Sequence, residues 1–193
     1  PEDVEVKVLR GGNHTYPGIF AMSSHRFDTP PFVTTDHMGF RVVTRSVSID
    51  IGVEYQSDWN LVGLPLEVED ASYNLIFPES IEGTLYSFDD GYSLETSLTQ
   101  GEGYWLRFES AGSTTITGTP VTELTISLNE GWNLISGLSE DISIYSVLDP
   151  DSIIVSGTLY GFSGGYVETD MLVPGRGYWI RANNSGNITL TSE

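Results

Sequence analysis

Apolar and polar residues alternate in several short stretches of the chain, which is the pattern of a β-strand with one buried face. The clearest stretches are Val4 to Leu9, Val47 to Val53 and Leu124 to Leu128. Residues 71–77 and 142–148 instead suit one short helical turn each. The pattern therefore predicts a mainly β protein with very little helix.

The chain beyond residue 46 contains two copies of one sequence pattern. The matched segments are 59–62 with 132–135, 83–86 with 157–160, 91–92 with 165–166, and 103–107 with 177–181. The offset is 73 residues for the first pair and 74 for the others. So regular an offset indicates two copies of one folding unit, and it predicts the same topology for residues 50–118 and 124–191.

Each copy has the turn residues that separate short strands. Glycine and aspartate or serine at 89–91 and 163–165 predict one hairpin per copy. We expect further strands at the Trp-Asn-Leu segment, through 104–107 or 178–181, and at 114–117 or 188–191.

The charge of the chain is strongly acidic and unevenly placed. The formal net charge at pH 7 is −19, and residues 1–45 hold equal numbers of basic and acidic residues. The whole deficit therefore lies beyond them, where Arg107, Arg176 and Arg181 are the only lysines or arginines. A surface so poor in cations cannot neutralise phosphates, which argues against nucleic acid and anionic membranes as partners. An acidic, solubilising surface is the simplest interpretation.

Cysteine is absent, so disulfides, thiolate metal sites and a cysteine nucleophile are excluded. No apolar run approaches the roughly 18 residues that a membrane-spanning helix requires. The first residues have no signal-peptide character. We therefore expect no membrane insertion.

Three motifs in the first quarter of the chain occur in a fixed order. They are Val8-Leu9-Arg10-Gly11-Gly12, then Ser24-His25-Arg26 with Thr29-Pro30, then Met38 to Val43. In this order they resemble the C-terminal end of a formylglycine-generating-enzyme (sulfatase-modifying-factor) domain, a variant of the C-type-lectin fold. Catalysis is not implied, because that family's oxygen-activating cysteines would fall within residues 13–25, which contain none.

Two motifs in the second copy carry another resemblance. Gly131 to Ser136 and Gly175 to Ile180 resemble a repeat of secreted and surface-anchored proteins of bacteria and archaea. The resemblance implies an extracellular or cell-surface location and a modular role, without an activity. Together these observations predict a partial lectin-like domain at 1–45 and two pseudo-equivalent small β-sandwich or barrel modules at 46–120 and 121–193. Each module would hold at most one short helix.

The residues that could carry chemistry are few. His14, His25 and His37 are eleven and twelve residues apart, which matches no metal-binding signature. The chain has no Gly-x-Ser-x-Gly elbow, and every histidine lies outside the repeats. We predict no enzymatic activity, no metal site and no cofactor. The aspartates at 89–90 and 149–151 have two interpretations: they form solvated turns, or they supply oxygen ligands to calcium.

Aromatic residues are the best candidates for a binding site. Tyr92, Tyr166, Trp105 and Trp179 lie on or beside the predicted hairpins, where sugar rings can stack on exposed aromatic faces. The competing interpretation places matched aromatics in the core of each module. On that interpretation Trp59 and Trp132 are largely buried, and replacing either with alanine costs about 3 to 5 kcal/mol.

These inferences favour a non-enzymatic extracellular structural or adhesive protein. The truncated lectin-like segment would leave strand edges unpaired, and another chain would have to cover them. We therefore expect self-association, as in a surface filament, through a strand containing Val4, Val6 and Val8. The alternative is a glycan-binding module that uses outward-facing tyrosine and tryptophan side chains.

Overall fold

The structure is a computed structural model that describes residues 9–10, 26–27 and 47–192. Contacts divide the chain into two units, residues 1–46 and 47–193. In the first unit β1 (Leu9–Arg10) pairs antiparallel with β2 (Arg26–Phe27). The strand expected at Val4, Val6 and Val8 and the three histidines lie outside the described residues.

The second unit is mainly β, as predicted, and each repeat contains one four-stranded antiparallel sheet. We refer to residues 47–120 as repeat 1 and residues 121–192 as repeat 2. The sheet of repeat 1 has the order β4 (Asp58–Gly63), β8 (Gly103–Phe108), β6 (Tyr86–Phe88) and β7 (Tyr92–Leu94). That of repeat 2 has the order β11 (Gly131–Ser136), β16 (Gly177–Ala182), β13 (Tyr160–Phe162) and β14 (Tyr166–Glu168).

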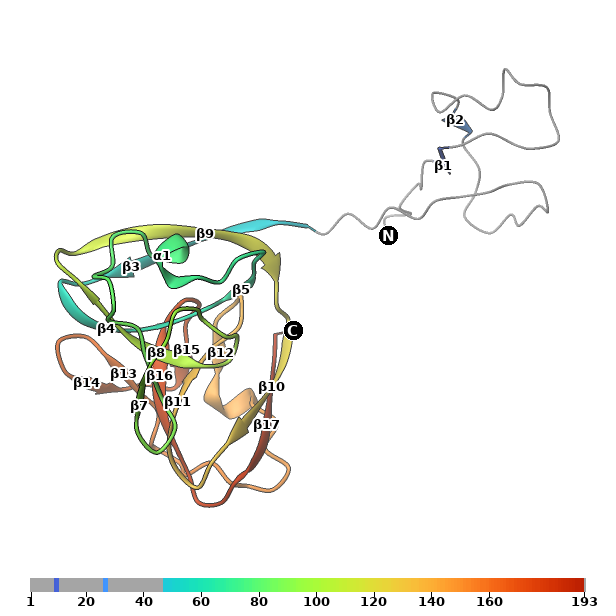
Figure 1. The fold of residues 1–193 in the computed structure, drawn as a ribbon. Coiled ribbons are helices and arrows are strands. Elements are labelled where there is room, and N and C mark those ends of the chain that lie inside the picture. The colour runs from blue at the N-terminus through green and yellow to red at the C-terminus, as the bar shows by residue number, and fades with distance from the viewer. Residues whose placement is uncertain (1–8, 11–25, 28–46, 193) are drawn as a thin grey trace. The chain divides into compact units, whose positions relative to one another are not determined.

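Smaller sheets cover the inner faces of these two sheets (Figure 1). Repeat 1 has a three-stranded sheet in the order β3 (Ile49–Tyr55), β9 (Gly112–Pro120) and β5 (Leu66–Glu67). Repeat 2 has the pairs β10 (Glu123–Leu128) with β17 (Gly186–Thr191) and β12 (Ile142–Ser143) with β15 (Met171–Leu172). The helical turns are α1 (Tyr73–Ile76) and the 3₁₀ turn η2 (Ile144–Ser146), close to where they were predicted.

The two repeats pair their strands in the same register. Trp59 lies opposite Arg107 in repeat 1, and Trp132 lies opposite Arg181 in repeat 2. Tyr86 pairs with Trp105 as Tyr160 pairs with Trp179. The prediction of one topology for both copies is therefore confirmed for the four-stranded sheets.

Each repeat has its own hydrophobic core beneath the inner face of its four-stranded sheet. Alternation along β8 and β16 points Leu106 and Ile180 inward, and both are fully buried. Tyr55 of β3 stacks on Phe108 of β8, with ring centroids 3.8 Å apart. This packing joins the small sheet of repeat 1 to its four-stranded sheet.

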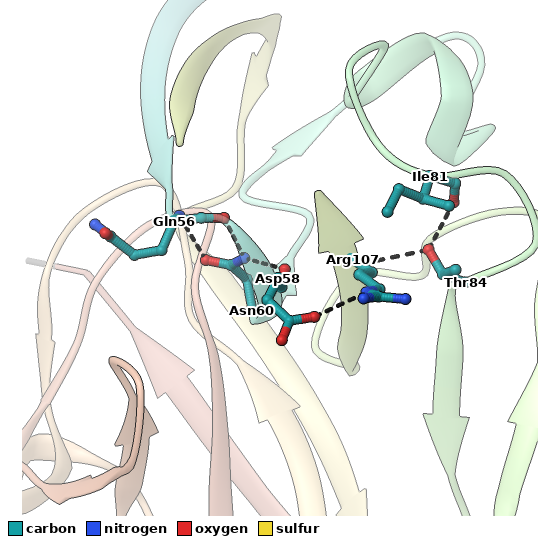
Figure 2. Close-up of polar contacts among 6 residues, drawn as sticks. All are labelled: Gln56, Asp58, Asn60, Ile81, Thr84 and Arg107. Carbon is teal, nitrogen blue, oxygen red and sulfur yellow. Dashed lines mark hydrogen bonds and ion pairs between the residues drawn. The ribbon is translucent and has the colours of Figure 1, made fainter. Parts of the chain in front are cut away.

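The asparagine of the repeated Trp-Asn-Leu motif closes the turn that precedes it (Figure 2). The Asn60 side chain accepts a hydrogen bond from Gln56 N–H and donates to the carbonyls of Gln56 and Asp58. Asn133 bonds to the turn before β11 in the same way. Asp58 has φ 72°, and glycine occupies the equivalent position 131 with φ 103°. The repeated asparagine therefore has a structural role.

Threonine and tyrosine of the other motifs fix the sheet in a similar way. Thr84 donates to the carbonyl of Ile81 and accepts from the backbone of Arg107, an arrangement visible in Figure 2. Thr158 makes the equivalent pair of bonds in repeat 2. The hydroxyl of Tyr104 accepts from Thr99 N–H at 2.9 Å, and the hydroxyl of Tyr178 accepts from Val173 N–H at 2.9 Å.

The two repeats are joined by a symmetric pair of backbone hydrogen bonds. Gly63 N–H donates to the carbonyl of Gly175 at 3.1 Å, and Ser136 N–H donates to the carbonyl of Gly101 at 2.9 Å. These residues correspond to one another through the repeat offset. The backbones approach so closely that a Cβ at Gly103 would lie 2.5 Å from the carbonyl oxygen of Ile135. The two copies thus form one packed body.

Across the described residues, no helix has both the length and the apolar character needed to cross a membrane.

Candidate functional site

The outer faces of the two four-stranded sheets are aromatic, and they meet where the repeats pack together. Leu61, Leu134 and Trp179 form a buried cluster at this contact. Partly buried aromatic rings surround the cluster, namely Phe88, Trp105, Tyr160 and Phe162. The aromatic residues of the two repeats are therefore part of one surface.

Two recesses open in this aromatic surface, one in each repeat. The repeat-1 recess has a volume of about 450 Å³ and is lined by Trp59, Tyr86, Tyr92, Trp105 and Phe162. The repeat-2 recess has a volume of about 460 Å³ and is lined by Trp132, Tyr160, Tyr166, Trp179 and Phe88. The second set repeats the first at equivalent positions. Both volumes lie in the range of small-molecule sites.

The phenylalanine that lines each recess belongs to the other repeat. Phe162 of repeat 2 packs against Trp105 with ring centroids 4.8 Å apart and planes at 78°. Phe88 of repeat 1 packs against Trp179 at the same 4.8 Å, with planes at 74°. Neither recess is complete within a single repeat.

The tryptophans and tyrosines of one repeat form the walls of its recess. Trp59 lies edge-to-face against Trp105 at 6.3 Å, with planes at 88°. Trp132 and Trp179 have the same arrangement at 6.4 Å and 88°. Perpendicular rings present two π-faces to a ligand in the angle between them. The recesses are therefore aromatic corners.

The four aromatic residues singled out from the sequence all line these recesses. Tyr92 and Tyr166 are both 59% exposed, as a contact residue should be. Trp105 is half-buried, whereas Trp179 is 8% exposed. The inner wall of the repeat-2 recess is therefore the more buried, whereas its other tryptophan, Trp132, is more exposed than Trp59.

The prediction that Trp59 and Trp132 are core residues is wrong. Trp132 is 44% exposed and Trp59 is partly exposed, because both point to the outer face of their sheet. The inner face is filled instead by neighbours such as Val62 and Tyr104. The alternation within the Trp-Asn-Leu strand was a usable signal, because it places Trp59 and Leu61 on the face opposite Asn60 and Val62.

Sequence reasoning also missed Tyr86, Tyr160, Phe88 and Phe162 as site residues. Alternation places Tyr86 and Phe88 on one face of β6, and Tyr160 and Phe162 on one face of β13, but the crossing of the phenylalanines between repeats has no local signal. Burial raises the pKa of the Tyr166 hydroxyl, and nearby Tyr92 raises it further. The Trp179 Nε1–H is buried and forms no hydrogen bond with any described residue.

A polar recess of about 370 Å³ adjoins the repeat-1 recess. It is lined by Gln56, Ser57, Asp58, Ser163 and Gly164, and it shares Trp59 and Phe162 with the aromatic recess. Asp58 is paired with Arg107, whose Nε lies 2.7 Å from Asp58 Oδ1 (Figure 2). Aromatic faces and hydrogen-bonding groups therefore meet at Trp59.

The aspartates considered as calcium ligands serve in turns and surface contacts. Asp149 accepts hydrogen bonds from the backbone N–H groups of Ile153 and Ile154, both at 2.9 Å. Asp89 Oδ1 accepts from the side chain of Asn129 at 2.9 Å. The residues that the structure describes contain no cluster of three or more metal-ligating side chains.

The chain matches no family model, no curated protein and no solved structure. The resemblances to the formylglycine-generating-enzyme domain and to prokaryotic surface repeats therefore stay predictions.

Proposed function

We propose that residues 47–192 form a non-enzymatic, extracellular adhesive module that binds neutral carbohydrate at the two aromatic recesses. The observation that carries the proposal is the pairing of two five-residue aromatic corners at equivalent positions. Matched aromatic residues that serve only in folding would be buried, as Tyr104 and Tyr178 are, yet Trp132, Tyr92 and Tyr166 are exposed. Exposed aromatic faces kept in both copies favour a ligand that stacks on them.

The chemistry of the recess walls fits a sugar ring. A pyranose has an apolar C–H face that packs on an aromatic ring, and hydroxyl groups around its edge that need hydrogen-bond partners. Tyr86 and Tyr92 bring hydroxyls to the repeat-1 recess, and Tyr160 and Tyr166 bring them to the repeat-2 recess. Mostly aromatic lining with a few polar groups is the usual composition of a small-molecule site.

Charge favours a neutral sugar over an acidic one. Residues 46–193 carry the entire net charge of −19, and an anionic glycan would be repelled by this field. Arg107 and Arg181 lie opposite Trp59 and Trp132 in the two sheets, and Asp58 already neutralises Arg107. An exposed pair of this kind supplies polar atoms without a net charge.

Self-association is a separate proposal. It depends on Val4, Val6 and Val8, which the structure does not describe. Carbohydrate binding at 47–192 depends only on the recesses, so each proposal can fail without the other. Both are compatible with a prokaryotic cell-surface location.

The test is binding of the full chain to cellohexaose, chitohexaose and mannohexaose, with oligogalacturonate as the acidic comparator, measured by calorimetry. We expect at least one neutral oligosaccharide to bind and the acidic one not to bind. The double variant Trp59→Ala/Trp132→Ala should weaken binding by about tenfold or more, which corresponds to about 1.4 kcal/mol.

Tyr145→Ala is the matched control, because Tyr145 is 80% exposed and lines neither aromatic recess. Its affinity should equal that of the unaltered chain. The proposal is overturned if no neutral glycan binds, or if binding survives the double variant. Saturable binding of choline in place of sugars would instead identify the recesses as sites for quaternary ammonium groups.

A further inference from the structure

We infer that the two carbohydrate sites differ in length. The repeat-1 site holds an oligosaccharide across its aromatic and polar recesses. In repeat 2, a hydrogen bond between Asn129 and Asp89 limits the site to a shorter ligand. The inference rests on the proposed function and concerns how far each site extends. Its basis is a difference between equivalent residues at the rims of the two recesses.

The repeat-1 site is continuous with its polar recess. Trp59 and Phe162 line both spaces, so a ligand stacked on Trp59 reaches the polar recess without leaving the surface. Together they form one groove with an aromatic end and a polar end. A second sugar ring can therefore follow the first.

The polar recess offers groups suited to sugar hydroxyls. Gln56, Ser57 and Ser163 are exposed, and Asp58 has a second carboxylate oxygen besides the one that binds Arg107. In Figure 2 the Gln56 side chain points away from Asn60, whose hydrogen bonds to Gln56 involve only the Gln56 backbone. The side-chain amide of Gln56 makes no hydrogen bond with another described residue.

The same rim positions in repeat 2 are occupied differently. The repeat offsets place Asn129 at the position of Gln56, and Asp89 at the position of Ser163. Asn129 Nδ2 donates to Asp89 Oδ1 at 2.9 Å, which links the two repeats across the rim. Gly131 stands at the position of Asp58, Glu130 at that of Ser57 and Asp90 at that of Gly164.

The linked pair therefore occupies the space through which a ligand would extend. The bond also engages the Nδ2 group of Asn129 and one carboxylate oxygen of Asp89. Both rim residues are exposed, so exchanging them leaves the core untouched.

The experiment compares a methyl glycoside with the hexasaccharide of the same sugar in single-site chains. Trp132→Ala removes the repeat-2 site and keeps the repeat-1 site intact. Trp59→Ala removes the repeat-1 site and keeps the repeat-2 site intact. At the repeat-1 site we expect the hexasaccharide to bind about tenfold more tightly than the methyl glycoside. At the repeat-2 site we expect the hexasaccharide to bind less than about threefold more tightly than the methyl glycoside.

Exchanging the rim residues supplies the matched control. In the Trp59→Ala chain, Asn129→Gln with Asp89→Ser should open the repeat-2 rim and raise its preference for the hexasaccharide toward tenfold. In the Trp132→Ala chain, Gln56→Asn with Ser163→Asp should close the repeat-1 rim and remove that preference. Equal length dependence at both sites, or no effect of either exchange, overturns the inference.

Nuclear magnetic resonance of the unaltered chain avoids the tryptophan substitutions. The indole N–H signals of Trp59 and Trp132 report the two recesses separately during one titration, and we expect the hexasaccharide to shift the Trp59 signal at the lower concentration. If neither signal responds to any neutral glycan, the proposed function fails. If both respond at the same concentrations for both ligand lengths, only the difference between the sites is refuted.

Discussion

Repeats 1 and 2 share their strand pairing and their aromatic corners, yet they differ at the rims of the two recesses. The shared residues include Asn60 and Asn133, which close turns, and Trp105 and Trp179, which form walls. The rim residues differ, as in Asp58 and its counterpart Gly131. Duplication therefore kept the scaffold and the stacking surface together, while the polar groups around them diverged.

The two faces of each four-stranded sheet differ in another way. Inward residues such as Leu106 and Ile180 fill the separate cores of the two repeats. Outward residues such as Leu61 and Leu134 join the repeats to each other. A substitution should therefore act on one repeat, on the contact between repeats or on the recess alone, according to the face it alters.

The largest expected effect is on the inward face. Leu106→Ala and Ile180→Ala each remove a fully buried side chain and should lower the free energy of unfolding by about 3 to 4 kcal/mol. Trp59→Ala and Trp132→Ala should cost only about 1 to 2 kcal/mol, because their rings are partly exposed. Urea unfolding followed by circular dichroism measures all four. A tryptophan cost equal to that of the leucine would contradict the assignment of these rings to the outer face.

The contact between the repeats comes next. Gly103→Ala brings a Cβ within 2.5 Å of the carbonyl oxygen of Ile135, and Gly177→Ala brings one within 2.8 Å of that of Val62. We expect losses of about 3 kcal/mol, since backbone atoms cannot move aside cheaply. Gly91→Ala is the control, because nothing lies within 4 Å of its Cβ, and it should change stability by less than about 0.5 kcal/mol. Stable, unaltered Gly103→Ala protein would show that the two repeats are not tightly packed.

Tyr104 of repeat 1 and Tyr178 of repeat 2 should differ in their contribution to the free energy of unfolding, by less than the substitutions above. Tyr104→Phe loses two hydrogen bonds, with Thr99 N–H and with Glu102 Oε2, whereas Tyr178→Phe loses one, with Val173 N–H. The first should cost about 2 kcal/mol and the second about 1 kcal/mol at neutral pH. Chemical denaturation of both variants checks the order, and a larger loss for Tyr178→Phe would contradict it.

The same pair predicts a pH dependence. Burial raises the pKa of Tyr104, and its hydrogen bond to Glu102 raises it further; burial also raises the pKa of Tyr178. Unfolded tyrosine loses its proton near pH 10, so the unfolded state binds fewer protons above that pH. The stabilising contribution is therefore complete below about pH 10 and declines as the pH rises toward the folded-state values. Unfolding at pH 8 and pH 11 should show this fall, and Tyr104→Phe should reduce it.

The smallest effect belongs to the ion pair that only repeat 1 has. Arg107→Ala removes the bond to Asp58, but the two side chains are 48% and 65% exposed. We expect a loss below about 0.5 kcal/mol, which 1 M salt should abolish. Arg181→Ala is the matched control, because Gly131 replaces the aspartate in repeat 2. A salt-independent loss above about 1 kcal/mol would mean that the pair is part of the scaffold.

Local pattern accounts for the part of the fold that the sequence predicted. The strand expected through 104–107 is present, and the turns at 89–91 and 163–165 do connect paired strands. These features depend on residues close together in the sequence. The same reasoning found Tyr92 and Tyr166, because exposed hairpin positions have a local signal.

The sequence by itself determined the β class, the duplication and the topology that the copies share, because strand alternation and turn formation are short-range properties. Only the tertiary structure decided that Phe88 and Phe162 cross between repeats and that Asn129 meets Asp89. Those contacts join residues at least 40 positions apart, and they exist because glycine backbones let the two sheets approach. The aromatic recesses are therefore a property of the packed pair, which neither copy specifies alone.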